Sequence, residues 1–240
     1  MPTSLPSQIS PILSIVMALS PRSVLDVGAG FGKYGVLCRE YLDVLAGTAE
    51  DAPYPPPRRT KLDCIEASAK YVSPLHRYIY DSIHIGDALD VLPTLASDSY
   101  DLALVVDVLE HFSPKDAAPF MSLVLNVSRV ALVATPKWES FQGRLFGNEY
   151  ERHRSKWTAR SLKSLASAHL LLRTRAASSH IVILSNEEDR LVHLYRQVGR
   201  ARRLSMWLRH RTAILEWLHL RRPLRRLFRR EASAKTGQGD

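Results

Sequence analysis

The chain has 240 residues, of which 45% are apolar, and a formal net charge of +9. A chain of this length and apolar content can bury one sizeable core, so we expect one domain with an appendage. No apolar window reaches the roughly 20 residues that a membrane-spanning helix needs. The first residues lack the basic segment of a secretory signal. The two cysteines, Cys38 and Cys64, have no C-x-x-C spacing and are expected to be reduced and buried, which predicts a cytoplasmic protein.

Strand-like and helix-like segments alternate from residue 23 to about residue 185, which predicts a parallel sheet covered by helices. The predicted strands span residues 23–27, 62–66, 83–86, 101–106, 130–134, 171–175 and 181–184. The predicted helices span residues 9–19, 33–45, 74–80, 115–127 and 158–168. The last two strands leave no room for a crossover helix between them, so the sheet should end with an antiparallel strand.

The first predicted strand ends in three glycines at alternate positions, Gly28, Gly30 and Gly32. Glycine permits a sharp turn with positive φ and lets a ligand approach the backbone. A P-loop is absent because Tyr34 stands where Ser or Thr is required, and the dinucleotide fingerprint is absent because Lys33 replaces its third glycine. The spacing suits a nucleoside ligand without phosphates, and a tight turn without any ligand is the alternative.

Acidic residues follow the next strands. Glu66 ends the second strand, where a carboxylate can accept hydrogen bonds from both hydroxyls of a ribose; a solvated residue at a strand end is the alternative. Asp87 and Ala88 follow the third strand, where they could bracket an adenine. Asp107 follows the fourth strand and begins the sequence DVLEHF, which ends at residue 112.

In this order the motifs resemble those of class I S-adenosylmethionine-dependent methyltransferases, over about residues 9–185. The form of the fourth motif is similar to that of small-molecule and ubiquinone-type enzymes. The resemblance implies an α/β, Rossmann-like fold with a seven-stranded, mostly parallel sheet and S-adenosylmethionine as the cofactor. The residues expected to bind the cofactor are Asp26, Gly28, Gly30, Gly32, Glu66, Asp87, Ala88 and Asp107.

Residues 142–157 are similar to a segment of uncharacterised bacterial methyltransferases and follow the fifth strand, so we expect them to line or cover the acceptor site. The catalytic candidates are His111, His153 and Asp107, with either histidine suited to accept a proton. Each histidine has a structural alternative, capping a helix or fixing its loop. Some ubiquinone-type enzymes bind a metal at the positions of Asp107, Glu110 and His111. The short Asp107 side chain weakens that case here, and no metal is assigned from the sequence.

The predicted function is methyl transfer to an oxygen, in preference to nitrogen or carbon, of a small molecule, sugar or lipid-linked intermediate. Enzymes that methylate nucleic-acid bases usually carry an Asn- or Asp-Pro-Pro-aromatic segment after the fourth strand, and this chain has none there. Nucleic acid is therefore a disfavoured substrate. The alternative function is non-catalytic: a scaffold, at a membrane or in a complex, that binds the cofactor without transferring a methyl group.

The end of the chain differs in composition from the rest. Residues 196–240 hold 12 arginines and one lysine against three acidic residues, a net charge of +10 that leaves −1 for the other residues. We expect a methyltransferase domain over residues 1–189, a basic amphipathic helical extension over 190–231 and a disordered tail over 232–240. Arginines beside Trp207 and Trp217 favour an anionic membrane surface, at the inner face of the membrane. Packing on the domain or in a homo-oligomer, and nucleic-acid binding, are the alternatives.

Overall fold

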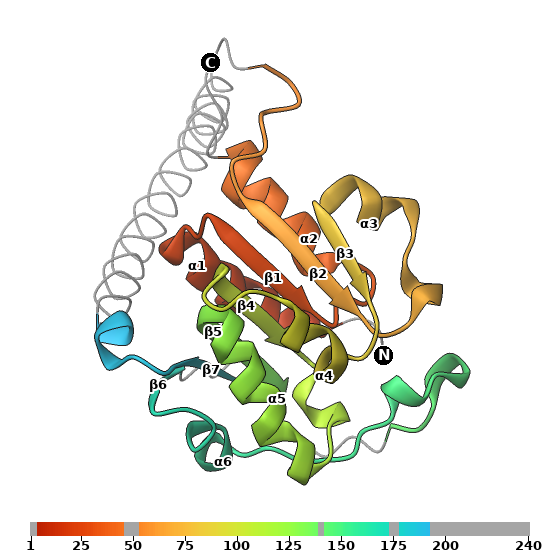
Figure 1. The fold of residues 1–240 in the computed structure, drawn as a ribbon, viewed down its shortest axis with the longest axis vertical. Coiled ribbons are helices and arrows are strands. Elements are labelled where there is room, and N and C mark those ends of the chain that lie inside the picture. Colours follow the sequence, from red (N-terminus) through yellow and green to blue (C-terminus); the bar gives the residue numbers. More distant parts are fainter. Residues whose placement is uncertain (1–3, 46–52, 139–141, 173–177, 193–240) are drawn as a thin grey trace, which may run out of the picture. The chain divides into compact units, whose positions relative to one another are not determined.

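The computed structural model describes residues 4–45, 53–138, 142–172 and 178–192, which contain a single seven-stranded sheet (Figure 1). The strands are β1 (Ser23–Val27), β2 (Lys61–Glu66), β3 (Ser82–Ile85), β4 (Tyr100–Val106), β5 (Ser128–Pro136), β6 (Ala168–Leu172) and β7 (Ser179–Ser185). Their spatial order is β3-β2-β1-β4-β5-β7-β6. Strands β1 to β5 are parallel, and β7 runs antiparallel to both of its neighbours. The predicted α/β fold class, with an antiparallel end to the sheet, is confirmed.

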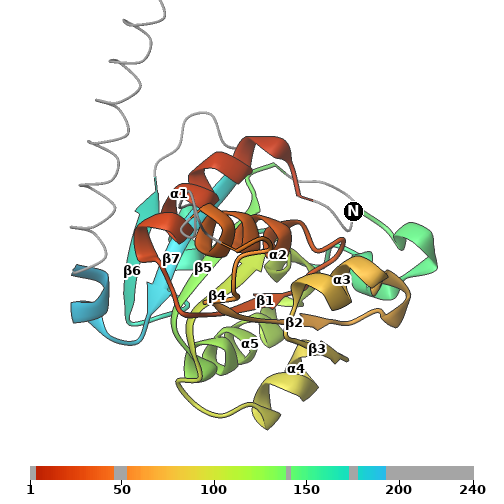
Figure 2. The same cartoon turned by 90° about the horizontal axis from the view of Figure 1, so that it is seen from above.

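Helices cover both faces of the sheet. They are α1 (Ile9–Leu19), α2 (Lys33–Cys38), α3 (Pro74–Ile79), α4 (Ala88–Val91), α5 (Pro114–Val127) and α6 (Ala159–Lys163). Figure 2 shows α1, α2 and α3 on one face and α4 and α5 on the other. The turns of α2 continue as a π-helix over Arg39–Val44, which accounts for the long helix predicted there.

Alternate residues of each central strand enter two different cores. Val24 of β1 packs in the cluster that includes Ile12 of α1, whereas the next residue, Leu25, packs in the cluster that includes Phe120 of α5. Successive side chains of a strand point to opposite faces, so a strand covered on both sides must be apolar throughout. This requirement explains the continuous apolar runs from which the strands were predicted.

The end of the sheet differs in detail from the prediction. Strand β6 begins at Ala168 rather than at residue 171, and its predicted last residues, 173–175, lie outside the described residues. Helix α6 stops at Lys163, five residues earlier than predicted, because the chain must reach the position where Ala168 pairs with Ser185 of β7. The predicted antiparallel pairing of these two strands is confirmed.

The topology places a crevice at the centre of the sheet. From β1 the chain proceeds outward through β2 to β3, then returns to form β4 on the other side of β1. In open α/β sheets, ligands bind beyond the carboxyl ends of strands where the strand order reverses in this way. We therefore expect a ligand-binding site at the loops after β1 and β4.

The extension and tail predicted over residues 190–231 and 232–240 lie outside the described residues, apart from residues 190–192. Across the parts of the chain that the structure describes, no helix combines the length and apolar character needed to cross a membrane.

Candidate active site

The glycine motif forms the turn from β1 into α2. Gly28, Gly30 and Gly32 have φ angles of 73°, 55° and 79°, in the left-handed region that favours glycine. The backbone N–H groups of Gly28 and Ala29 both donate to the carbonyl oxygen of Ile65, at 2.8 and 3.2 Å. A Cβ on Gly28 would lie 2.5 Å from a methyl group of Val108. The turn is thus held between the ends of β2 and β4, and no side chain fits at Gly28.

Glu66 is at the end of β2, as predicted, and its buried carboxylate accepts hydrogen bonds from the backbone N–H groups of Gly30 at 2.8 Å and Ser68 at 2.9 Å. Burial raises the pKa of Glu66 above its ordinary value, and these hydrogen bonds oppose the rise. The carboxylate therefore ties the glycine turn to the second strand and lines the same cavity as the turn.

Asp87 precedes α4 and caps it by accepting a hydrogen bond of 2.9 Å from the N–H group of Leu89. Asp87 and Ala88 line the cavity beside Glu66. Asp26 also lines it, although Oδ2 of its carboxylate accepts a hydrogen bond from Tyr80. These predicted residues therefore share one cavity, of about 250 Å³, with Gly28 and Gly30. After the sequence prediction it is called the cofactor cavity.

Asp107 lies in the cofactor cavity after β4, with a φ angle of 53°. Gln8 donates a hydrogen bond of 2.5 Å to its Oδ2 atom, while Oδ1 is buried and has no hydrogen-bond partner among the described residues. Burial raises the pKa of Asp107 to about 6, against the opposing effects of the Gln8 hydrogen bond and the Lys33 charge. An unpartnered buried acceptor is rare, and a donor from a ligand would satisfy it.

The segment before α1 contributes residues that the sequence did not reveal. Ser4 lines the cavity, and Nζ of Lys33 donates hydrogen bonds to its carbonyl oxygen at 2.5 Å and its hydroxyl at 3.1 Å. Gln8 is fully buried. The sequence around Gln8 gives no local signal that its side chain binds a residue of the site, because the partner, Asp107, is 99 positions away.

His111 and His153 lie together, although 42 positions separate them in the sequence. Their ring centroids are 4.9 Å apart with an interplanar angle of 72°. His111 ends the 3-10 turn of Leu109–His111, and the N–H groups of Arg154 and Ser155 donate to the carbonyl oxygen of Glu110 in that turn, at 2.8 and 3.1 Å. Main-chain hydrogen bonds therefore fix the loop after β5 to the turn after β4.

Nδ1 of His111 is 3.2 Å from the carbonyl oxygen of Arg152. A carbonyl can only accept, so this nitrogen carries the proton and Nε2 keeps a lone pair. Burial lowers the pKa of His111 to about 4, with the Arg152 hydrogen bond opposing the change. The imidazole is consequently neutral at ordinary pH, and it faces the cofactor cavity.

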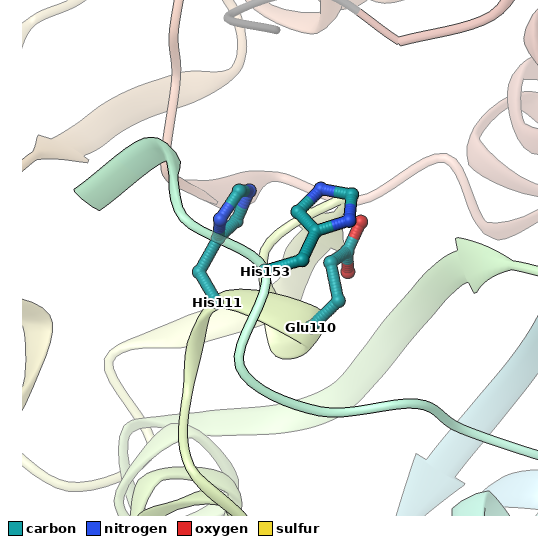
Figure 3. A group of neighbouring side chains, drawn as sticks. All are labelled: Glu110, His111 and His153. Atoms are coloured by element: carbon teal, nitrogen blue, oxygen red, sulfur yellow. The ribbon is translucent and has the colours of Figure 1, made fainter. Parts of the chain in front are cut away.

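Glu110 completes a group with the two histidines. One potential ligand atom from each of Glu110, His111 and His153 lies within 4.8 Å of the others. Figure 3 shows the three side chains beside one another. Burial, together with the charge of nearby Asp107, raises the pKa of Glu110 to about 8. Asp107 does not belong to this group, so the three positions suggested by the ubiquinone-type resemblance are not the three that the fold brings together.

A second cavity, of about 470 Å³, lies beyond β5 and is lined in part by residues 152–157. Glu110 and His153 line this cavity, whereas His111 lines the cofactor cavity, and Arg154 lines both. The two cavities therefore adjoin at the histidines. The part of the predicted acceptor loop at residues 152–157 thus lies beside both cavities.

Comparison with known proteins finds matches among solved structures. No protein-family model matches the chain, and no curated protein matches it. The N-terminal domain of EvdMO1 with SAH bound is 13% identical, with a TM-score of 0.55 over 77% of this chain and 82% of that one. The bifunctional kinase-methyltransferase WbdD is 14% identical, with a TM-score of 0.54 over 77% of this chain and 40% of that one.

An O-methyltransferase family protein from Burkholderia thailandensis is 13% identical, with a TM-score of 0.50 over 75% of this chain and 56% of that one. This chain thus spans about half or less of the length of the last two structures. Such distant likenesses concern the arrangement of strands and helices and leave the substrate open. The chain has the fold of class I S-adenosylmethionine-dependent methyltransferases.

Proposed function

We propose that this chain transfers a methyl group from S-adenosylmethionine to an oxygen atom of a small-molecule, sugar or lipid-linked acceptor. The observation that carries the proposal is the shared lining of one cavity by Gly28, Glu66, Asp87 and Asp107, each at the end of a strand or just beyond it. This is the edge of an open α/β sheet at which ligands bind. The O-methyltransferase name of a structural neighbour supports the choice of oxygen.

The residues present suit the cofactor. The bare backbone of the glycine turn leaves room for the methionine part. Asp107 offers an ammonium group a buried oxygen that has no hydrogen-bond partner among the described residues. Glu66 would accept hydrogen bonds from ribose hydroxyls, as such carboxylates do at the end of a second strand. Asp87 and Ala88 would lie beside the adenine.

The reacting groups would meet where the two cavities adjoin. The acceptor oxygen attacks the methyl carbon, the carbon–sulfur bond breaks with its electron pair left on sulfur, and the hydroxyl proton must leave. Because the sulfonium methyl is already activated, alignment and proton removal are the protein's main tasks. His111 and His153 are the side chains that would meet the hydroxyl, either as proton acceptors or through a group that they bind.

Cofactor binding and turnover can be tested separately. Calorimetry should detect one S-adenosylmethionine or S-adenosylhomocysteine per chain. Incubation with isotopically labelled methyl donor and a metabolite extract should label an acceptor, whose methylated atom is then identified by mass spectrometry and NMR. Failure of both ligands to bind would remove the basis of the proposal, and binding without any transfer would favour the scaffold.

We also propose that the arginine-rich extension binds anionic membranes. The support is its composition, a net charge of +10 over residues 196–240 with Trp207 and Trp217 among the arginines. Indole rings enter the membrane interface while guanidinium groups bind lipid phosphates. Binding there would bring the domain to lipid-linked acceptors.

A further inference from the structure

Glu110 has a buried carboxylate, and no described residue satisfies one of its two oxygens. It is 3% exposed, and Oε2 accepts a hydrogen bond of 3.2 Å from the hydroxyl of Thr135. Oε1 is buried and lacks any hydrogen-bond partner within the described part of the chain. A carboxylate removed from water is costly unless it is paired, hydrogen-bonded or bound to a cation. The atom therefore indicates a missing partner.

Two imidazoles share the space beside this carboxylate. Figure 3 shows Glu110, His111 and His153 extending toward one another, the first two from the turn after β4 and the third from the loop after β5. The hydrogen bond from Nδ1 of His111 to the Arg152 carbonyl fixes the tautomer and leaves Nε2 with its lone pair. Histidines that bind metals usually donate their other ring N–H to a carbonyl or carboxylate in this way.

We propose that Glu110, His111 and His153 form a binding site for a first-row transition-metal dication such as Zn²⁺. Two imidazole nitrogens and one carboxylate oxygen are a donor set found for Zn²⁺ in catalytic sites, which keep a further position open. Mg²⁺ prefers oxygen ligands and waters in octahedral geometry, so this set selects against it. The donor atoms, and not the spacing of motifs along the chain, identify the class of metal.

Holding an ion requires the three side chains to move closer together. The ligand atoms lie within 4.8 Å of one another. With bonds of about 2.0–2.2 Å at tetrahedral angles, two ligands of one zinc ion are roughly 3.3–3.6 Å apart, so side-chain rotations must close the widest gap by up to about 1.5 Å. The main-chain hydrogen bonds from Arg154 and Ser155 to the Glu110 carbonyl hold the two contributing segments in place during such rotations.

The position of the site gives the ion a role, and this role rests on the proposed function. His111 lines the cofactor cavity, and Glu110 and His153 line the second cavity. An ion between them could bind the acceptor hydroxyl at its open position and lower the pKa of that hydroxyl. The proton would pass to water, the oxygen would attack the methyl carbon, and the metal would keep its oxidation state.

The direct test is calorimetric titration of Zn²⁺ into the full-length, chelator-treated protein. We expect one site in the wild type that is lost, or weakened by at least about tenfold, in Glu110→Gln and in His153→Ala. His169→Ala is the matched control, because His169 is an exposed histidine on β6 outside the group, and it should bind like the wild type. Mg²⁺ at the same concentrations should produce no heat that depends on Glu110.

Visible absorption of bound Co²⁺ gives a second measurement, since Co²⁺ in a four-coordinate, tetrahedral site absorbs much more strongly than the hydrated ion. These bands should vanish in His111→Ala. The proposal fails if Zn²⁺ binds equally to the wild type, Glu110→Gln and His153→Ala, or does not bind to the wild type. Zn²⁺ binding without cofactor binding would overturn the methyltransferase proposal and leave the metal site intact. Cofactor binding and methyl transfer without Zn²⁺ binding would overturn the metal site alone.

Discussion

The hydroxyl group of Tyr80 donates a hydrogen bond of 2.6 Å to Oδ2 of Asp26, and both side chains are buried. Burial raises the pKa of Asp26 to about 6 from an ordinary value of 3.8, although this hydrogen bond opposes the rise. The charge of Glu66 adds to the increase. Asp26 therefore joins the first strand to the end of α3 while remaining a buried acid beneath the cofactor cavity.

The first prediction is that Asp26 destabilises the folded chain as pH rises. The carboxyl group of Asp26 loses its proton near pH 4 in the unfolded chain and near pH 6 in the folded chain. The folded state thus binds the proton more tightly, and its stability relative to Asp26→Asn should fall by roughly 2 kcal/mol from pH 4 to pH 7. Denaturant unfolding of both proteins without cofactor measures the difference. A difference that is constant with pH would contradict the prediction.

The second prediction concerns the close approach of Gly28 to Val108. In Gly28→Ala the new Cβ would meet a methyl group at 2.5 Å, at a φ of 73°, so both stability and cofactor affinity should fall. The double variant with Gly28→Ala and Val108→Ala should recover the stability lost through the clash. It should not recover the roughly 1–2 kcal/mol lost through backbone strain. Gly143→Ala, where no atom lies within 4 Å of the new Cβ, is the control. Thermal unfolding and calorimetry measure the two effects.

The third prediction is that Glu66→Ala weakens cofactor binding by roughly 1–3 kcal/mol. Its carboxylate positions the Gly30 backbone and would bind the ribose, so both contributions are lost together. Asp90→Ala removes an exposed carboxylate from the neighbouring α4 and should leave the affinity unchanged. Equal affinities of Glu66→Ala and the wild type, measured by calorimetry, would remove Glu66 from the site.

The fourth prediction separates the two histidines from Asp107. His111→Ala or His153→Ala should lower turnover by about 10²-fold or more while the cofactor affinity changes little. Asp107→Asn should weaken cofactor binding itself, because Asp107 lies in the cofactor cavity and not with the histidines. Single-turnover rates with labelled cofactor, compared with calorimetric affinities, distinguish these patterns. Turnover near the wild-type level in both histidine variants would leave alignment as the mechanism.

The parts of the fold that local patterns specify could be predicted. Strand β1 has the predicted bounds, because burial on both faces favours a mostly apolar run, here with the one acid Asp26, and the glycines end it. Strand β6 could not be placed as well, because its apolar residues permit several starts. Its start is set by pairing with β7, in which Ala168 lies opposite Ser185, and local sequence carries no information about that register.

The candidate site also has parts that could be predicted and parts that could not. Glu66 and Asp87 could be identified because each lies at or just beyond the end of a strand, and parallel strands bring their ends to one edge of the sheet. Two contacts could not be predicted, because no sequence motif links the segments that they join. They are the contact between His111 and His153 and the hydrogen bond between Gln8 and Asp107. The metal positions suggested by the ubiquinone-type resemblance, within residues 107–111, likewise omitted His153, which only the folded loop brings to Glu110.

The last prediction concerns the arginine-rich extension. Replacing Arg225, Arg226, Arg229 and Arg230 with glutamine should weaken binding to anionic vesicles by about 1 kcal/mol per residue at low salt. Lysine at the same four positions keeps the charge and is the matched control, so it should retain most of the binding. Sedimentation with anionic and neutral vesicles measures the effect, and added salt should reduce it.

Two outcomes would contradict this proposal. The full-length chain could fail to sediment with anionic vesicles, or the lysine variant could lose as much binding as the glutamine variant, which would exclude a simple charge interaction. Sedimentation velocity without lipid tests the alternative function of the same segment. If the full-length chain is a dimer that the glutamine variant abolishes, and neither protein binds vesicles, the extension joins two copies of the chain and does not bind a membrane.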